Sequence, residues 1–355
     1  MEHQDTLIAT IRWQQRGFSR LGCQFYDALS EELIADVEAG GPAGDLLAPF
    51  AAEPFESAYV LRLLAGLHWL VLRGAAPALA GHFPSAGGDG DAHGAMDVIR
   101  EVLRDPPPEV LHYLSRPPQT NEAGRAAALA SGMTFIAREA GLPLRLREIG
   151  ASAGLNLRLD AYWYQQGGTG WGNPSSPVRF TGLWPQARSL FAVCPEVLDR
   201  RGCDRHPIDV TTSAGAVTLL SYVWPEPAER FTRARDAIAL AHGRPVAIDR
   251  ADADAWLDEQ LRTQTPGAAF VVYHSVVWQY LGQIAQERIH ALLVAAGSSA
   301  TPQMPLAWLR LEPHRQTYVP AELRLTFWNG QGDGPGEWLL ATTDFHGGSL
   351  HWLAG

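Results

Sequence analysis

The spacing of apolar residues divides the chain into a helical first part and a second part in which strands and helices alternate. Residues 8–15, 31–38 and 57–73 carry apolar side chains at helical spacing, and 123–140 continues this pattern up to Gly141. Segment 57–73 is apolar on nearly every face, so we expect a buried helix there. Residues 1–140 are therefore predicted to form an all-helical N-terminal region.

After Gly141 the pattern changes to strands that alternate with helices. A first strand leads into Gly150, and the glycine-rich stretch 165–174 is expected to be a loop-like insertion. Two strands at the end flank a glycine-rich turn, which predicts an antiparallel hairpin. Residues 141–355 are therefore predicted to form a Rossmann-like α/β domain with a seven-stranded, mostly parallel sheet. The further strands are expected at 217–223, 245–249, 268–274, 305–311, 323–328 and 338–345, and the helices at 227–242, at 252–262 and between 275 and 296.

Charge and cysteine content narrow the class of protein. The 355 residues include 28 basic and 38 acidic side chains, a formal net charge of −10 without a long basic run, which argues against a nucleic-acid partner. No secretion signal and no apolar run of the roughly 20 residues needed by a membrane helix are evident. The three cysteines form no Cys-x-x-Cys pair, so we expect a cytoplasmic protein without a membrane partner. The sequence leaves the oligomeric state open.

A metal site is not expected. Cys194, Cys203 and His206 carry ligand atoms that zinc prefers, but no fourth ligand is evident beside them.

The turn after the first strand is the strongest candidate for binding chemistry. Small residues let a ligand approach the backbone, and a helix that starts there offers free N–H groups. Two functions are compatible with the same residues, because the turn can bind a nucleoside or can present Ser152 as a nucleophile. The residues concerned are Glu148, Gly150, Ala151, Ser152, Gly154 and Asn156.

Strand–helix alternation, the Glu148-x-Gly150-x-x-x-Gly154 turn and the terminal hairpin together resemble the S-adenosylmethionine-dependent methyltransferase fold. The resemblance implies that Glu148, Gly150, Ser152 and Gly154 hold the methionine end of the cofactor, with Asn156 at the helix start. It further implies a ribose-binding position after the second strand. If that strand is 217–223, the candidates are Tyr222 or Trp224, with Glu226 slightly later in the chain.

The sequence is also similar to a bacterial family known as a domain of unknown function. The motifs that carry this similarity cover most of the chain and specify no reaction. They are Glu148-Ile-Gly-Ala-Ser-Ala-Gly-Leu-Asn-Leu157, Gly202-Cys-Asp-Arg-His-Pro-Ile-Asp209, Ser221-Tyr-Val-Trp-Pro-Glu226 and His274-Ser-Val-Val-Trp-Gln-Tyr280.

His274 and Ser275 are the catalytic candidates. They end the strand expected beside the first one, and a neutral histidine there could take a proton from a methyl acceptor while Ser275 orients it. A satisfied core histidine is the alternative interpretation. The candidates for substrate binding are Asp204, Asp209, Trp278 and Glu312.

We therefore expect transfer of a methyl group from S-adenosylmethionine to an unknown small molecule, with the helical region choosing the acceptor. One alternative is a serine hydrolase, in which Ser152 acts with Asp333 or Asp344 and with His346. Another is a non-catalytic nucleoside-binding protein on the same fold.

Overall fold

The computed structural model describes residues 2–184, 190–314, 320–331 and 334–354. Within this part of the chain, the residues fold into two compact units. Unit 1 comprises Met1–Thr120 and Val210–Arg235, and unit 2 comprises Asn121–Asp209 and Asp236–Gly355.

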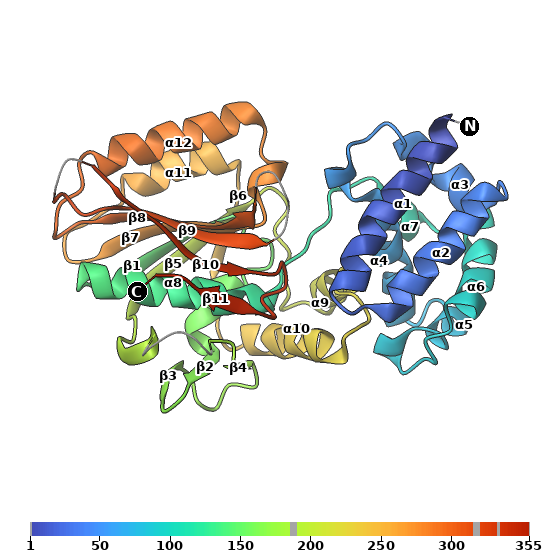
Figure 1. The fold of residues 1–355 in the computed structure, drawn as a ribbon, viewed down its shortest axis with the longest axis horizontal. Coiled ribbons are helices and arrows are strands. Elements are labelled where there is room, and N and C mark those ends of the chain that lie inside the picture. The colour runs from blue at the N-terminus through green and yellow to red at the C-terminus, as the bar shows by residue number, and fades with distance from the viewer. Residues whose placement is uncertain (1, 185–189, 315–319, 332–333, 355) are drawn as a thin grey trace. The chain divides into compact units, whose positions relative to one another are not determined.

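Unit 1 is helical, and α4 (Tyr59–Leu72) is buried on almost every face, which confirms the prediction for 57–73. The apolar core of the unit gathers around α4 and includes Phe18, Phe25, Phe83 and Trp224. The other helices of the unit are α1 (Glu2–Arg20), α2 (Gln24–Glu38), α3 (Pro42–Leu47), α5 (Pro77–Ala80), α6 (Ala92–Arg104), α7 (Pro108–Leu114), α9 (Ser213–Ser221) and the start of α10 (Ala228–Ala241) (Figure 1).

The strand predicted at 217–223 is wrong, because this segment lies in α9 and the turn that follows it. The Thr212 side chain accepts a hydrogen bond from the Gly215 N–H at 3.0 Å and caps the start of the helix. The apolar run is too short for its pattern to distinguish a strand from a helix, and packing against α4 favours the helix.

His68 lies in the middle of α4 and is fully buried. Its Nδ1 lies 3.2 Å from the Ser221 carbonyl oxygen and its Nε2 lies 2.7 Å from Ser85 Oγ. Burial lowers the pKa of His68 to about 4, because the charged imidazolium would lose its hydration.

The depressed pKa of His68 makes the stability of unit 1 depend on pH. The unfolded chain takes up this proton near pH 6.5 and the folded chain only near pH 4, so stability falls as pH drops through this window. We expect the free energy of unfolding of unit 1 to decrease by about 2 kcal/mol from pH 7 to pH 5. Urea titrations of the wild type and His68→Gln test this. The decrease should vanish in His68→Gln and persist in His112→Gln, which changes an exposed histidine.

Unit 2 is built on an eight-stranded sheet rather than the seven-stranded one expected. Its strand order is β11-β10-β9-β8-β7-β1-β5-β6. From β6 to β8 all neighbours are parallel, and β9, β10 and β11 each run antiparallel to the strand before. The strands are β1 (Leu144–Ile149), β5 (Val197–Asp204), β6 (Ala247–Arg250), β7 (Ala269–Ser275), β8 (Leu306–Pro313), β9 (Ala321–Trp328), β10 (Gly336–Thr343) and β11 (Leu350–Trp352).

Two strands of this sheet were missed, β5 beside β1 and β11 at the end. The sequence of β5 is too charged to be recognised as an inner strand, but its charges are paired. Asp199 binds Arg147 of β1 at 2.5 Å, and Arg201 binds Asp249 of β6 at 2.5 Å. Ion pairs between neighbouring strands therefore replace the apolar side chains that an inner parallel strand normally carries.

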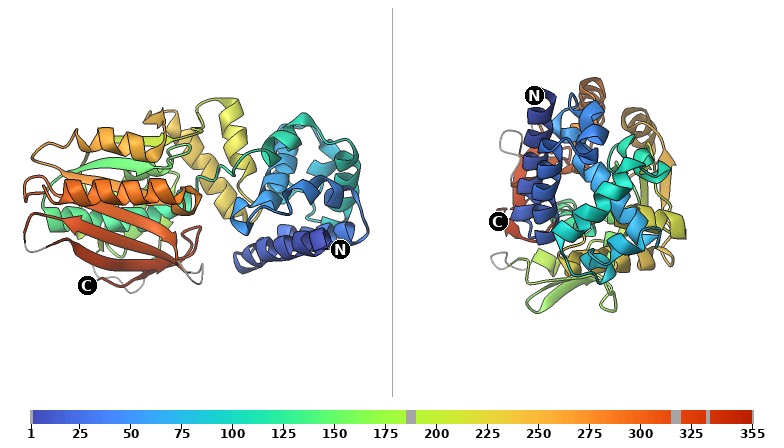
Figure 2. Two further views of the ribbon diagram at one scale, coloured as in Figure 1. Left: turned by 90° about the horizontal axis from the view of Figure 1, so that it is seen from above. Right: turned by 90° about the vertical axis from the view of Figure 1, so that its right-hand side faces the viewer.

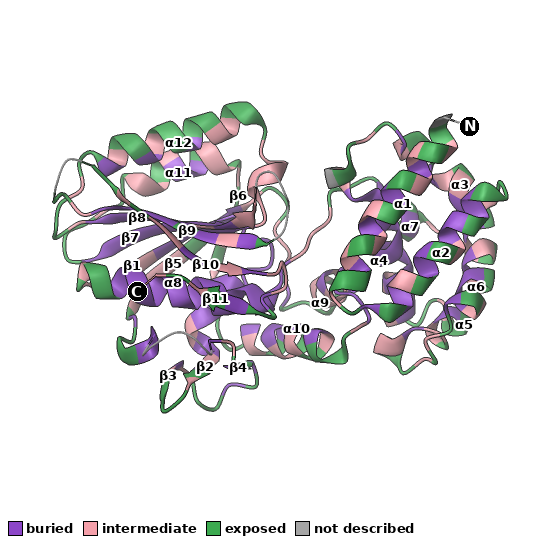
Figure 3. Ribbon diagram, viewed as in Figure 1, coloured by how far each residue is buried: buried purple, intermediate pink, exposed green. Residues whose placement is uncertain are grey.

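Helices cover both faces of this sheet. In Figure 1, α11 (Ala253–Leu261) and α12 (Gln283–Gly297) lie above it and α8 (Ala126–Ala140) lies below, and Figure 2 shows the same layers from other directions. The central strands β1, β7, β8 and β9 are buried along most of their length, and β7 is buried throughout (Figure 3). Most residues of β5, β6, β10 and β11 are half-buried or exposed. The predicted helices at 252–262 and up to 296, and the predicted terminal hairpin, are confirmed.

The segment after β1 differs from the prediction in two ways. The turn leads into a short 3-10 helix, η5 (Asn156–Ala161), and not into an α-helix. The expected loop at 165–174 instead contributes to a small second sheet, which packs a group of aromatic side chains. Its strands are β2 (Trp163–Gln166), β3 (Thr169–Gly172) and β4 (Arg179–Thr181).

Candidate functional site

The parallel strands place most of the predicted site residues at one edge of the sheet. The strand order β6-β5-β1-β7-β8 is that of a doubly wound fold. In such folds, ligands bind outside the carboxyl ends of the strands, at the point where the strand order reverses. Here that point lies between β1 and β7. Glu148, Asp204, His274 and Glu312 all lie at or next to the carboxyl ends of their strands.

The backbone after β1 is tightly curved. Gly150, Ser152 and Gly154 have φ values of 67°, 50° and 68°. A left-handed backbone is ordinary for glycine but uncommon for serine, because residues with a Cβ atom favour negative φ. Ser152 is therefore held in an unfavourable backbone conformation. Asp204 helps to hold this conformation, because its Oδ2 accepts the Ser152 N–H at 2.9 Å.

A second strained position follows β7. Val276 has a φ of 52°, which is a genuine outlier for a β-branched side chain. Among the described non-glycine residues, the positive φ angles are those of Ala58, Ser152 and Val276, so two of the three flank the point between β1 and β7. Strain of this kind costs about 1–3 kcal/mol per residue and is concentrated at functional sites.

The glycines of the turn are explained by internal packing. A Cβ atom at Gly150 would clash with the Val277 side chain, and one at Gly154 would lie 2.8 Å from Ile248 Cδ1. The side of the turn toward these residues is therefore filled by the protein itself.

Glu148 is a fully buried carboxyl group. It pairs in register with Tyr273 of β7, and the Tyr273 hydroxyl donates to its Oε2 at 3.3 Å. Burial raises the pKa of Glu148 well above its usual value, and the nearby Asp204 adds to this rise. The Tyr273 hydrogen bond and the positive charges of Arg125 and Arg158 oppose the shift without cancelling it.

Asn156 is 0% exposed, and neither its Oδ1 nor its Nδ2 has a hydrogen-bond partner among the described residues. An unsatisfied buried amide costs about 1–3 kcal/mol, so such groups normally bind water or a ligand. Its backbone carbonyl lies 3.4 Å from the Tyr273 hydroxyl, which also contacts Glu148.

Two buried arginines complete this site, which sequence reasoning missed. Arg158 donates to the carbonyl groups of Ala153 and Gly154 at 3.1 and 2.9 Å. Arg125 donates to the carbonyl groups of Phe345 and Ser275 at 3.0 and 3.3 Å. The sequence does not reveal the role of either arginine, because their partners are backbone carbonyl groups and both partners of Arg125 lie far away along the chain. We call Glu148, Asn156, Asp204, Arg125 and Arg158 the carboxylate site.

His274 lies on the opposite face of the sheet from Glu148. Tyr273 shares its face with Glu148, so the next residue of the strand points to the other side, toward Trp308 and Glu312. The indole N–H of Trp308 donates to His274 Nε2 at 3.1 Å. Because that N–H can only donate, Nε2 accepts and the proton is on Nδ1, which donates to Glu312 Oε1 at 2.6 Å. Both ring nitrogens are therefore engaged.

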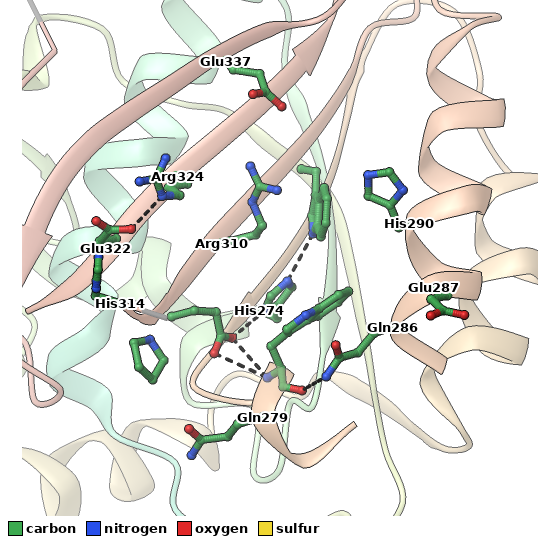
Figure 4. Close-up of a pocket in the computed structure, with 14 residues that line it drawn as sticks. His274, Gln279, Gln286, Glu287, His290, Arg310, His314, Glu322, Arg324 and Glu337 are labelled. Atoms are coloured by element: carbon green, nitrogen blue, oxygen red, sulfur yellow. Dashed lines mark hydrogen bonds and ion pairs between the residues drawn. The ribbon is translucent and has the colours of Figure 1, made fainter. Parts of the chain in front are cut away.

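His274, Trp278 and Glu312 line a pocket of about 880 Å³ on the α12 face of the sheet (Figure 4). The structure thus groups three predicted site residues here, separately from the carboxylate site. The remaining lining residues were not predicted, although polar and apolar residues alternate along β8 and β9, which is typical of a sheet with one wet face. These residues are Gln279, Gln286, Glu287, His290, Trp308, Arg310, Pro313, His314, Glu322, Arg324 and Glu337.

Trp224 and Glu226 belong to unit 1. The Trp224 ring packs edge-on against Phe18 at a centroid distance of 4.7 Å, and a Glu226 oxygen accepts the Phe25 N–H at 2.7 Å in the first turn of α2. The ribose role predicted for them depended on 217–223 being the second strand, and that strand prediction is wrong. The strand beside β1 is β5, and it ends at Asp204.

The remaining predicted residues are also located. Ala151 is buried and its N–H donates to the Cys203 carbonyl at 2.9 Å, while Ser275 lies at the end of β7. Asp209 is exposed and interacts electrostatically with Arg158. No group of three or more His, Cys, Asp or Glu side chains in the described segments is arranged to hold a metal ion.

The sheet order and the carboxyl-edge sites define a doubly wound α/β protein with an additional helical unit. The chain belongs to the family described as "uncharacterized protein conserved in bacteria (DUF2332)", whose model matches residues 9–352. No curated protein and no solved structure matches the chain. Among the described residues, none of the helices is both long and apolar enough to cross a membrane.

Proposed function

We propose that this protein binds S-adenosylmethionine at the carboxylate site and transfers its methyl group to a small molecule. The observation that carries the proposal is the buried, unsatisfied amide of Asn156, a residue whose backbone carbonyl contacts the same Tyr273 hydroxyl as Glu148. An amino acid ligand offers both donors and acceptors for such an amide, and its ammonium group suits the Glu148 carboxylate.

The position of Asp204 supports the same proposal. It ends β5, the strand next to β1, which is where doubly wound folds carry the acid that binds ribose hydroxyls. In this proposal Asp204 takes the role that the sequence had suggested for Trp224 and Glu226. The cofactor supplies the activated methyl group, and the protein residues bind and orient it in line with the acceptor.

Calorimetric titration with S-adenosylmethionine and S-adenosylhomocysteine tests the proposal. We expect the wild type to bind both and Asn156→Ala to lose most of the binding. The unliganded Asn156→Ala protein should be no less stable than the wild type, because the substitution removes two unsatisfied polar atoms. Asn173→Ala, which removes an exposed amide, is the control. Absence of binding to the wild type would refute the proposal.

A second candidate function, serine hydrolysis by Ser152, is favoured by the left-handed backbone of that residue, since nucleophile turns are strained. Of its candidate partners, Asp333 lies outside the described residues. The Asp344 carboxylate accepts the N–H groups of His346, Gly348 and Ser349 and so closes its own turn.

A fluorophosphonate probe separates the two functions. Under the methyl-transfer proposal we expect no labelling of the wild type, whereas labelling that disappears in Ser152→Ala would establish the hydrolase. Binding of S-adenosylmethionine without any formation of S-adenosylhomocysteine would favour the non-catalytic nucleoside-binding protein.

A further inference from the structure

The pocket on the α12 face is a built cavity with an excess of negative charge. Its volume of about 880 Å³ is in the range of small-molecule sites. His290, Glu287 and Gln286 come from α12 on one side, and Glu322, Arg324 and Glu337 come from β9 and β10 on the other (Figure 4). Four glutamates stand against two arginines in its lining.

Both arginines are already engaged within the pocket wall. Arg324 Nε binds Glu322 at 2.7 Å. The Arg310 guanidinium lies 4.0 Å from the ring centre of Trp308 and donates to Thr326 Oγ1 at 2.8 Å. With Arg324 and Glu322 paired, Glu287, Glu312 and Glu337 stand against the single charge of Arg310, so the charge left for a ligand is negative.

Glu312 is the carboxylate that the structure holds in place. His274 Nδ1 donates to its Oε1 at 2.6 Å, and the N–H groups of Val277 and Trp278 donate at 3.1 and 3.4 Å. The imidazole is itself fixed by Trp308, so Glu312 has little freedom to turn away. Its side chain is 16% exposed, and Oε2, which accepts the Trp278 N–H at 3.4 Å, is the oxygen with remaining acceptor capacity for a ligand.

The lining of the same pocket also includes aromatic rings and an unsatisfied acceptor. The Trp278 ring stacks on His274 at 5.0 Å and lies 5.6 Å from the Trp308 ring. Gln279 Oε1 is shielded from solvent and has no hydrogen-bond partner among the described residues. Tryptophan faces attract cations, and a free amide oxygen requires a donor.

We propose that this pocket binds a small organic ammonium ion. Glu312 is the counter-ion, Trp278 packs against the ligand body, and Gln279 Oε1 accepts one of its N–H groups. His274 acts as a positioning residue that holds Glu312. The inference is independent of the proposed methyl transfer, because the pocket and Glu148 lie on opposite faces of the sheet.

The test uses three probes that share a phenethyl body and differ in charge: phenethylamine, the neutral phenethyl alcohol and the anionic hydrocinnamate. We expect calorimetry to show binding of phenethylamine at least about tenfold tighter than that of either other probe, as a charge-assisted hydrogen bond requires. Equal binding of all three probes, preference for hydrocinnamate or no binding of phenethylamine would overturn the proposal.

Variants locate the site. Glu312→Gln keeps an acceptor for His274 and the two N–H groups but removes the charge, and it should weaken phenethylamine binding about tenfold or more. Glu259→Gln, which removes the charge of an exposed carboxylate on α11 outside the pocket lining, is the matched control and should change phenethylamine binding less than about twofold. If Glu312→Gln fails to fold, Gln279→Ala should show the same selective loss. Unchanged phenethylamine binding in Glu312→Gln would contradict the assignment. Binding of S-adenosylmethionine to the same variant reports separately on the carboxylate site.

Discussion

Replacing Glu148 by glutamine is expected to weaken S-adenosylmethionine binding by about 100-fold, equivalent to about 3 kcal/mol. The carboxyl group is fully buried, so without a ligand its raised pKa favours the neutral form. The ammonium group of the cofactor stabilises the ionised form. Binding of this cation therefore lowers the pKa of Glu148 and favours loss of its proton. Glutamine keeps the shape of the side chain and cannot supply this charge.

This coupling makes binding depend on pH. The affinity of the wild type should increase as pH rises toward the folded pKa of Glu148, and binding should release a proton. Titrations in two buffers with different ionisation enthalpies measure that proton. Glu148→Gln should release none. Wild-type binding that takes up or releases no proton would show that the ligand does not pair with Glu148.

Stability provides the control for this substitution. Because the folded pKa of Glu148 is raised, the group stabilises the folded state most below its unfolded pKa of about 4.3, and this contribution is lost as pH rises. At neutral pH, Glu148→Gln should therefore keep or raise the melting temperature of the unliganded protein. A lower melting temperature would mean that the loss of binding reflects damage to the fold.

The substitution Gly124→Ala is expected to destabilise unit 2 by about 2–4 kcal/mol and to lower its melting temperature by roughly 5–12 °C. Gly124 lies in η4 (Ala123–Arg125), directly before α8, and a Cβ atom there would overlap the His346 carbonyl oxygen. Gly347 approaches the Gly124 carbonyl in the same way. Two backbones are in direct contact, so no side chain can move aside to make room.

The contact also positions the carboxylate site. Arg125 follows Gly124 and reaches the carbonyl groups of Phe345 and Ser275, so a shift of this backbone displaces the guanidinium near Glu148. Thermal unfolding measures the stability effect. Gly168→Ala, where an added Cβ meets nothing within 4 Å, is the control and should change stability by less than about 0.5 kcal/mol. Equal stability of the two variants would show that the contact at Gly124 is not tight.

The sequence by itself determined the elements whose pattern is local. Helix α4, strand β7 and the terminal hairpin follow from apolar spacing and glycine-rich turns, because each buries a continuous face or closes over a few residues. The turn after β1 was located for the same reason, since its small residues stand together between a strand and a short helix. Glu148 and Asn156 were identified with it.

Only the tertiary structure decided the identity of the second strand and the division of the site. The charges of β5 hide an inner strand until Arg147 and Asp249 are seen to neutralise them across the sheet, and 217–223 became a helix through its contact with α4. Register then placed Glu148 beside Tyr273 and turned His274 to the opposite face. The pairing of strands that are distant in the sequence sets this register, so the order of residues along the chain does not reveal it.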